Sequence, residues 1–166
     1  MYPYNKLTFD SAIEAIDALY GLSHSVGPIK LKHQEFLAEV IGEGSYNMKY
    51  PDDPIIYLGD RFGETKTGRR ILIVNTTSKK LFFKDRDWFP HPQSNGPIFQ
   101  SCDFILIVKH SEDFTRFSSI MIDWDVIPQF LGFDWNRDMW HTYLSKAFIN
   151  ESEILLPESD YRKFLP

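Results

Sequence analysis

Cysteine is nearly absent from this 166-residue sequence, and long apolar runs are missing from it. The single cysteine, Cys102, cannot form a disulfide within the chain, which is typical of proteins from a reducing compartment. No apolar run approaches the ~20 residues that a membrane-spanning helix needs, and the first residues lack the apolar stretch of a signal peptide. We therefore expect a cytoplasmic protein with no membrane contact.

Signatures of several chemistries are also missing. The sequence has neither Gly-x-x-x-x-Gly-Lys-Ser/Thr nor Gly-x-Gly-x-x-Gly, so it offers no phosphate-binding loop for a nucleotide. Its five histidines show no i, i+4 pairing and Cys102 has no cysteine partner, which argues against a structural zinc site. Cys102 with His110 suggests a thiol nucleophile, but a lone cysteine just before an apolar strand is more typical of a core.

The composition is that of a globular domain, with 43% hydrophobic, 25% charged and 16% aromatic residues. A chain of this length can bury a sizeable core, and we find no repeat or linker that divides it. We therefore expect a single domain over residues 1–166. The aromatic residues favour strands and leave some side chains for a binding face.

Hydrophobic periodicity predicts N-terminal helices, then strands, then a C-terminal helix. Helical spacing covers 8–21 and 31–41, and the glycines at 42 and 44 are expected to end the second helix. The unbroken apolar run at 104–108 predicts a strand with both faces covered. The other expected elements are strands at 55–58, 69–77, 81–83 and 117–122, a hairpin loop at 63–68, a long loop at 84–101, a helix at 135–148 and an irregular tail at 155–166. This order indicates an α+β fold with a central mixed β-sheet.

Charge is distributed unevenly along the chain. Residues 61–100 hold eight basic and three acidic side chains, a formal charge of +5 within a chain whose total is −5. Such a segment is able to meet phosphates. Its candidate nucleic-acid-binding residues are Arg61, Arg69, Arg70, Lys79 and Lys80. The alternative is that these residues are solvated strand ends.

A motif of acidic and basic residues begins before this basic segment and ends within it. Pro51-Asp52 is followed twelve residues later by Glu64-Thr65-Lys66. This pattern resembles the signature of the PD-(D/E)XK nucleases, the restriction-endonuclease-like superfamily. The resemblance implies a metal-dependent DNA endonuclease that hydrolyses phosphodiester bonds. In such a site carboxylates hold Mg²⁺, the metal activates water and polarises the phosphate, and the lysine steadies the developing charge.

The resemblance also implies particular roles and a fold. Asp52, Glu64 and Lys66 would be catalytic, and the Mg²⁺ ligands would be Asp52, Asp60, Glu64 and Glu39. A looser similarity spans residues 34–130, where a helix precedes a strand meander and later core strands. It implies a restriction-endonuclease-like core that binds DNA, and a homodimer would suit a two-fold duplex site.

A second register of the same resemblance leaves activity open. Glycines flank the Glu64-Thr65-Lys66 segment, which is typical of a hairpin tip, and charges at a tip are often ordinary turn residues. The strand at 71–77 then takes the place of the active-site strand. Asp60 would supply the first aspartate, but Ile73 and Asn75 would occupy the positions of the acid and the lysine. Such a site would be inactive.

A non-catalytic function is the alternative. Residues 30–49 are similar to a short helical motif of some plasmid and phage proteins, which suggests a mobile-element origin and implies no chemistry. A binding or inhibitor protein of the anti-defence or immunity type would use the aromatic and acidic stretch at 123–140, and Trp88, against a protein partner. The other interpretation is that these tryptophans pack beneath the sheet.

Overall fold

The computed structural model describes residues 31–59, 62–83, 89, 91–93, 102–112 and 116–160. The helix expected at 8–21 and most of the loop expected at 84–101 lie outside the described residues, as do Asp60, Arg61 and Trp88. Within the described part, no helix is long and apolar enough to span a membrane.

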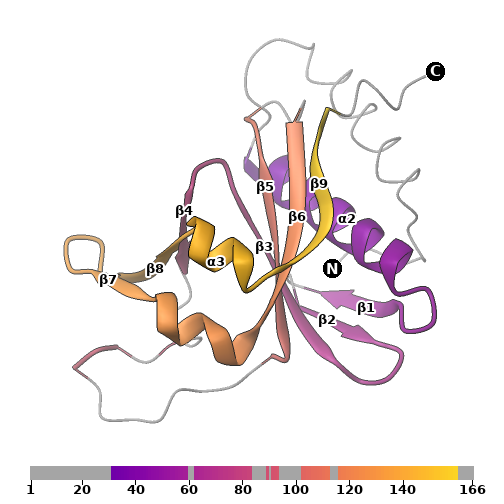
Figure 1. Ribbon diagram of the computed structural model, residues 1–166, viewed down its shortest axis with the longest axis horizontal. Coiled ribbons are helices and arrows are strands. Elements are labelled where there is room, and N and C mark those ends of the chain that lie inside the picture. The colour runs from indigo at the N-terminus through magenta and orange to yellow at the C-terminus, as the bar shows by residue number, and fades with distance from the viewer. Residues whose placement is uncertain are drawn as a thin grey trace.

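A six-stranded mixed sheet forms the centre of the fold (Figure 1). In spatial order its strands are β1 (Ile55–Gly59), β2 (Phe62–Thr65), β3 (Arg70–Thr76), β5 (Phe104–His110), β6 (Arg116–Asp123) and β9 (Glu153–Asp160). β3 and β5 run parallel, and the other neighbouring strands pair antiparallel. With helix α2 (Leu31–Lys49) before the first strand, the fold is α+β with a mixed sheet, as the sequence predicts.

The two central strands are apolar on both faces because both faces of the sheet are covered. Successive strand side chains point to opposite faces. Ile71 and Ile73 of β3 accordingly join a buried cluster with α2, whereas Leu72 and Val74 join a second cluster on the other face. Cys102 lies in that second cluster, so the interpretation of it as a core residue is confirmed.

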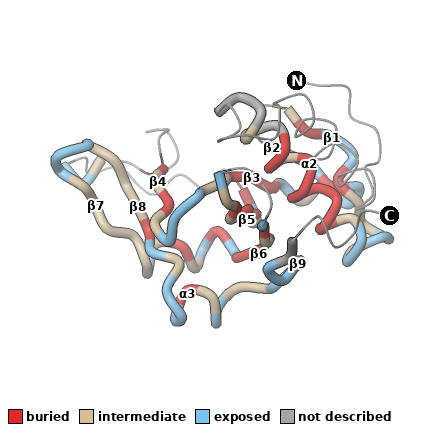
Figure 2. Tube along the Cα trace, turned by 90° about the horizontal axis from the view of Figure 1, so that it is seen from above, coloured by how far each residue is buried: buried red, intermediate tan, exposed pale blue. Residues whose placement is uncertain are grey.

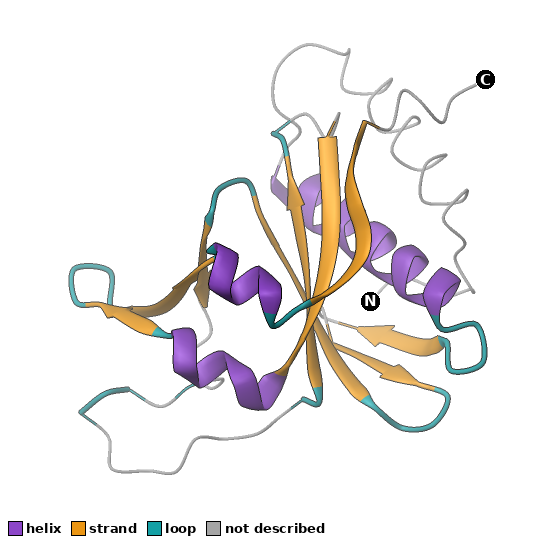
Figure 3. Ribbon diagram, in the orientation of Figure 1, coloured by secondary structure: helices purple, strands orange, loops and turns teal. Residues whose placement is uncertain are grey.

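A smaller sheet lies beside the second core cluster. It consists of β4 (Lys80–Phe83), β8 (Met139–Tyr143) and β7 (Gly132–Asp134), in that order. The 3-10 helix η1 (Trp124–Phe130) leads from β6 to β7, and the short helix α3 (Lys146–Asn150) leads from β8 toward β9 (Figure 3). The β7–β8 hairpin projects away from the six-stranded sheet (Figure 1), and its tip is exposed (Figure 2).

The strands expected at 55–58, 69–77, 81–83, 104–108 and 117–122 are all present, within a few residues of their expected ends. The expected end of the second helix was wrong, because α2 continues through Gly42 to Lys49. A Cβ atom at Gly42 would lie 3.1 Å from Cγ2 of Ile73. Glycine therefore allows the helix to approach β3 closely and does not stop it.

The helix expected at 135–148 was also wrong, since most of that range is the β7–β8 hairpin. The Asp134 carboxylate accepts hydrogen bonds from the backbone N–H groups of Asn136 and Arg137, both at 3.0 Å, and so builds the hairpin turn. Phe133 and Trp140 then pair across the strands. The expected irregular tail was wrong for its first part, because β9 reaches Asp160.

Candidate functional site

The motif residues lie near two turns at one end of the sheet. Asp52 is exposed in the turn between α2 and β1, Glu64 is exposed on β2, and Lys66 is exposed in the turn that follows β2. Glu39 lies on α2 and is partly buried. The hairpin loop expected at 63–68 was wrong for its first half, because Gly63, Glu64 and Thr65 belong to strand β2, which the sequence analysis did not predict. The turn itself begins at Lys66.

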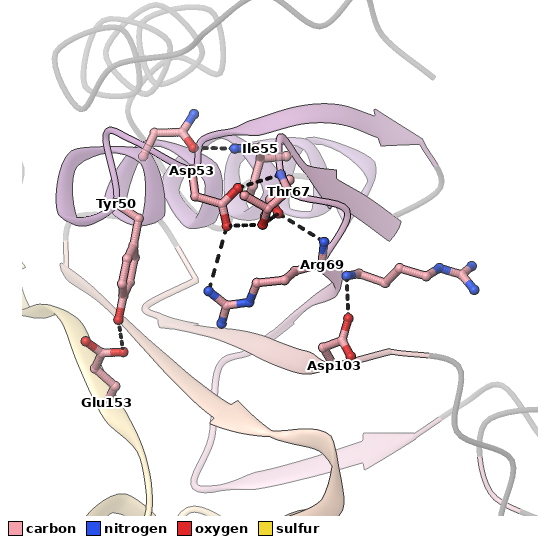
Figure 4. A network of polar contacts seen from close by, with 10 residues as sticks. Tyr50, Asp53, Ile55, Thr67, Arg69, Asp103 and Glu153 are labelled. Carbon is pink, nitrogen blue, oxygen red and sulfur yellow. Dashed lines mark hydrogen bonds and ion pairs between the residues drawn. The ribbon is translucent and has the colours of Figure 1, made fainter.

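The two turns are joined through Asp53 (Figure 4). The Lys66 N–H donates to the carbonyl of Pro54 at 2.9 Å. The Thr67 N–H and hydroxyl donate to the two carboxylate oxygens of Asp53, at 2.8 and 2.9 Å. Arg69 Nη1 lies 3.8 Å from the same carboxylate. Asp53, which the sequence motif does not include, is therefore the acid that holds this end of the sheet.

The charge of Asp53 is stabilised where it lies. Burial raises the pKa of this carboxyl, but hydrogen bonds from the Thr67 backbone and hydroxyl and the charge of Arg69 outweigh it, so the pKa lies below its ordinary value. Its oxygen atoms are occupied by donors from the chain itself. This arrangement is typical of a structural clamp.

A second clamp connects the end of α2 to β9. The Tyr50 hydroxyl donates to Glu153, and Lys49 Nζ lies 3.1 Å from the other carboxylate oxygen. Burial and the Glu153 carboxylate raise the pKa of Tyr50 to about 12. Tyr46 stacks on Tyr50 with ring centroids 4.9 Å apart. Burial raises the pKa of Tyr46 to about 12, and the Asp53 carboxylate, by its charge and as a hydrogen-bond acceptor, adds to this against the charge of Arg69. Within the described residues, the buried Tyr46 hydroxyl makes no hydrogen bond of normal geometry.

Carboxylates do not gather into a metal site within the part of the chain that the structure describes. No group of three or more histidine, cysteine, aspartate or glutamate side chains is placed there to hold a metal ion. In the second register, Ile73 is buried in the α2 core, and Asn75 Nδ2 lies 3.0 Å from His110 Nε2. Neither position offers a carboxylate.

Sequence reasoning missed Glu43, which lies one turn after Glu39 on α2 and is fully buried. The Asn47 amide donates to the Glu43 carboxylate at 3.3 Å, and Asn47 Oδ1 accepts from the Ile55 N–H at 2.8 Å. Buried carboxylates are uncommon because removing charge from water is costly. That burial is visible only once the close approach of α2 to the sheet is known.

The candidate basic residues are divided between the two ends of β3. The Arg69 guanidinium lies 3.9 Å from the Phe104 ring centroid, and Arg70 is exposed at the start of β3. Lys79 and Lys80 follow the other end of β3, and Lys80 Nζ lies 4.8 Å from the Phe82 ring centroid. At ~3.3 Å per residue, a strand of this length separates the pairs by roughly 20 Å. They do not form one compact patch.

An aromatic pocket opens between the small sheet and residues Phe89 and His91. Its volume is about 180 Å³. The side chains that line it are those of Phe83, Phe89, His91, Phe133, Asp138, Met139 and Trp140. The rings of His91 and Phe133 lie 5.0 Å apart, and those of Phe133 and Trp140 lie 5.1 Å apart, all in edge-to-face contact. The aromatic stretch singled out in the sequence therefore contributes both buried packing and an open cavity.

Hydrogen bonds fix the orientation of His91 at the rim of this pocket. The Gln93 N–H donates to His91 Nδ1 at 3.2 Å, so a neutral ring carries its proton on Nε2. That nitrogen donates to Asp138 Oδ1 at 2.9 Å. The two partners lie 47 residues apart in the sequence, so no local pattern marks them as a pair.

A second, more polar cavity of about 250 Å³ lies where β5 ends and β6 begins. Its lining includes His110, Lys109 and Arg116, and Arg116 Nη2 pairs with Glu158 Oε1 at 3.2 Å. Burial lowers the pKa of His110, against a hydrogen bond with the Ser111 carbonyl, so this histidine remains neutral at pH 7.

No protein-family model matches the sequence, and no curated protein is significantly similar to it.

Proposed function

We propose that this protein is a non-catalytic binding protein built on a restriction-endonuclease-like core. The order of elements supports such a core, because a helix is followed by the antiparallel meander β1–β2–β3 and then by β5 parallel to β3. A helix before a strand meander and further strands is the arrangement that the sequence resemblance implies.

The observation that carries the proposal is the composition of β3. A Mg²⁺ site in such a core needs carboxylates that converge beside the active-site strand. β3 instead presents Ile73 to the core and Asn75 to His110. The best-held acid at that end of the sheet, Asp53, is occupied by Thr67 and Arg69.

The small sheet supplies a surface suited to binding. The β7–β8 hairpin projects from the body of the protein (Figure 1). Residues in and next to its turn line the aromatic pocket, and Trp135 in the turn is 62% exposed. Exposed tryptophan beside a preformed cavity is typical of protein interfaces. The protein partner of an inhibitor or immunity protein would dock on this side.

The proposal is tested by offering the purified protein a metal and a substrate. We expect no heat of Mg²⁺ or Mn²⁺ binding above that of buffer, and no cleavage of plasmid or linear DNA with either ion compared with EDTA. Glu64→Ala and Lys66→Ala are assayed beside Lys146→Ala, an exposed lysine on α3 that lies outside both the motif and the candidate DNA-binding residues. Metal-dependent cleavage that is lost in the first two variants and kept in the third would overturn the proposal.

A Mg²⁺-dependent DNA endonuclease is the second candidate, favoured by the contact between the two turns. The Lys66–Pro54 hydrogen bond brings the segments that carry Asp52, Glu64 and Lys66 to neighbouring positions. In that case the helix carboxylate would be Glu39 or the buried Glu43. DNA would be the partner, and sedimentation with and without a duplex would show whether a homodimer forms on it.

A further inference from the structure

Resting on the proposed binding function, we infer that the aromatic pocket receives an aromatic side chain from a partner protein. The pocket has the size for one ring. Its volume is about 180 Å³, and an apolar cavity of about 150 Å³ is known to hold benzene. An indole or phenol ring fits this space, whereas a helix or strand backbone does not.

The walls match an aromatic guest. Phe83 and Phe89 are 2% exposed and form the floor of the pocket, with their ring centroids 5.0 Å apart. Phe133 and Trp140 form the side that belongs to the hairpin. Rings prefer edge-to-face contacts with centroids about 4.5–7 Å apart. The wall rings already meet one another in that geometry and offer the same contacts to one more ring.

The rim is held in place by a backbone conformation that is costly to maintain. Asp138 has φ of 56°, the one positive φ of a non-glycine residue in the described part of the chain. Such residues persist where surrounding contacts hold them, and they cluster at ligand clamps. Asp138 is the last residue of the hairpin turn, and its carboxylate accepts a hydrogen bond from His91 Nε2 at 2.9 Å. The His91–Asp138 pair therefore keeps the mouth of the pocket preformed.

The charge around the pocket disfavours a nucleotide. The described residues that line it include one carboxylate, Asp138, and no lysine or arginine. Arg137 of the hairpin turn is paired with Asp134 at 2.9 Å. Nucleic-acid sites need cations for the phosphates, so a base attached to phosphate would meet repulsion at this rim. An uncharged ring from a protein would not.

The surface beyond the pocket favours a protein over a free small molecule. Trp135 contacts His91 and Phe133 with ring centroids 5.7 and 4.7 Å away, and it is 62% exposed. A small molecule that fills the pocket would leave this tryptophan in water. A protein that inserts one ring would cover Trp135 as well, in the manner of an anchor residue surrounded by further contacts.

The test uses NMR titration of the isotope-labelled full chain with four probes. These are the blocked peptide acetyl-Ala-Trp-Ala-amide, free tryptophan, AMP and tetramethylammonium chloride. We expect the peptide to shift the indole signal of Trp140 saturably, with Kd of about 1–5 mM for one ring and its flanking atoms. The other three are expected to bind at least fivefold more weakly.

Two pairs of variants locate the site. Met139→Phe places a ring in the pocket and is expected to abolish the shifts. Met48→Phe makes the same change on α2, where Met48 is 61% exposed, and is expected to preserve them. Asp138→Ala is expected to weaken binding at least threefold, whereas Asp138→Asn, which tolerates positive φ and keeps an acceptor, restores it. If Met139→Phe does not fold, the two Asp138 variants still show whether the peptide binds in this pocket.

Several results would overturn the inference. They are the absence of saturable shifts with the peptide, binding of AMP, tetramethylammonium or free tryptophan that is as tight as that of the peptide or tighter, or peptide binding that survives in both Met139→Phe and Asp138→Ala. None of these depends on DNA cleavage or on metal binding. A protein that cleaves DNA and still binds the peptide would therefore refute the proposed function alone. A protein that neither cleaves DNA nor binds the peptide would refute only the inference about the aromatic pocket.

Discussion

The clamp at Asp53 leads to a specific prediction, that Asp53→Ala destabilises the protein strongly although the residue lies in a surface turn. The carboxylate accepts two hydrogen bonds from Thr67, and its side chain is only 16% exposed. A hydrogen bond to a charged group contributes about 1.5–3 kcal/mol. Because Thr67 is exposed and water can replace part of what is lost, the lower end applies to each bond. The Arg69 ion pair, at 3.8 Å and partly exposed, adds less than about 1 kcal/mol.

We therefore expect Asp53→Ala to lower the free energy of unfolding by about 3 kcal/mol. That loss is a large part of the ~5–15 kcal/mol available to an ordinary domain. The neighbouring Asp52→Ala is the matched control, since Asp52 is exposed in the same turn. Substitution there is expected to change stability by less than about 0.5 kcal/mol.

Urea unfolding followed by circular dichroism measures both variants at pH 7. The Asp53 pKa is depressed in the folded state, so its contribution is present above the unfolded pKa of about 3.9 and is lost as the pH falls through the folded value. The difference between wild type and Asp53→Ala should therefore shrink in acid. Equal stabilities of Asp52→Ala and Asp53→Ala at pH 7 would refute the assignment of Asp53 as the clamp.

Further predictions concern three other sites. Tyr46→Phe removes a buried hydroxyl that makes no hydrogen bond of normal geometry within the described residues, so thermal unfolding should show unchanged or higher stability, by up to about 1 kcal/mol; a clear loss would show that its contact with Asp53 stabilises the fold. Burial lowers the pKa of His110 and His141 in the folded state. The free energy of unfolding should therefore decrease as the pH drops below the unfolded histidine pKa of about 6.5, by at most about 1.4 kcal/mol per pH unit for each histidine. His141→Gln should make this decrease smaller in unfolding curves measured from pH 8 to 5. A Cβ at Gly132 would lie 2.8 Å from His141 Cε1, so Gly132→Ala should cost about 1–3 kcal/mol, and a cost that persists in the His141→Ala background would exclude this clash as the cause.

Strands were predictable where a single local pattern decides the structure. The apolar runs of β3 and β5 identify central strands because burial on both faces leaves no polar alternation. The β7–β8 hairpin was not predictable in the same way. Met139 and Tyr143, like Trp140 and Leu144, are four residues apart and so fit a helix. The side-chain contacts of Asp134 in the turn select the hairpin instead.

The candidate sites also include residues that the sequence identifies and residues that only the structure identifies. The motif at Asp52, Glu64 and Lys66 is readable from the sequence, and so is the aromatic stretch that contains Phe133. The Asp53 clamp depends on a turn that returns 14 residues later, and the His91–Asp138 pair joins two distant segments. Such pairings depend on how the sheets are assembled, and no spacing in the sequence encodes them.

The position of β9 has a consequence for how this protein is made. β9 pairs with β6 at one side of the large sheet, and its Glu153 meets Tyr50, which is 103 residues earlier in the chain. During synthesis, β6 emerges first and roughly 30 residues pass before β9 begins. At about 5–20 residues per second, this side of β6 lacks its partner for roughly 2–6 s. The backbone N–H and C=O groups along this edge of β6 are open to pairing with other chains during that interval, so the nascent protein should depend on chaperones more than the finished fold does.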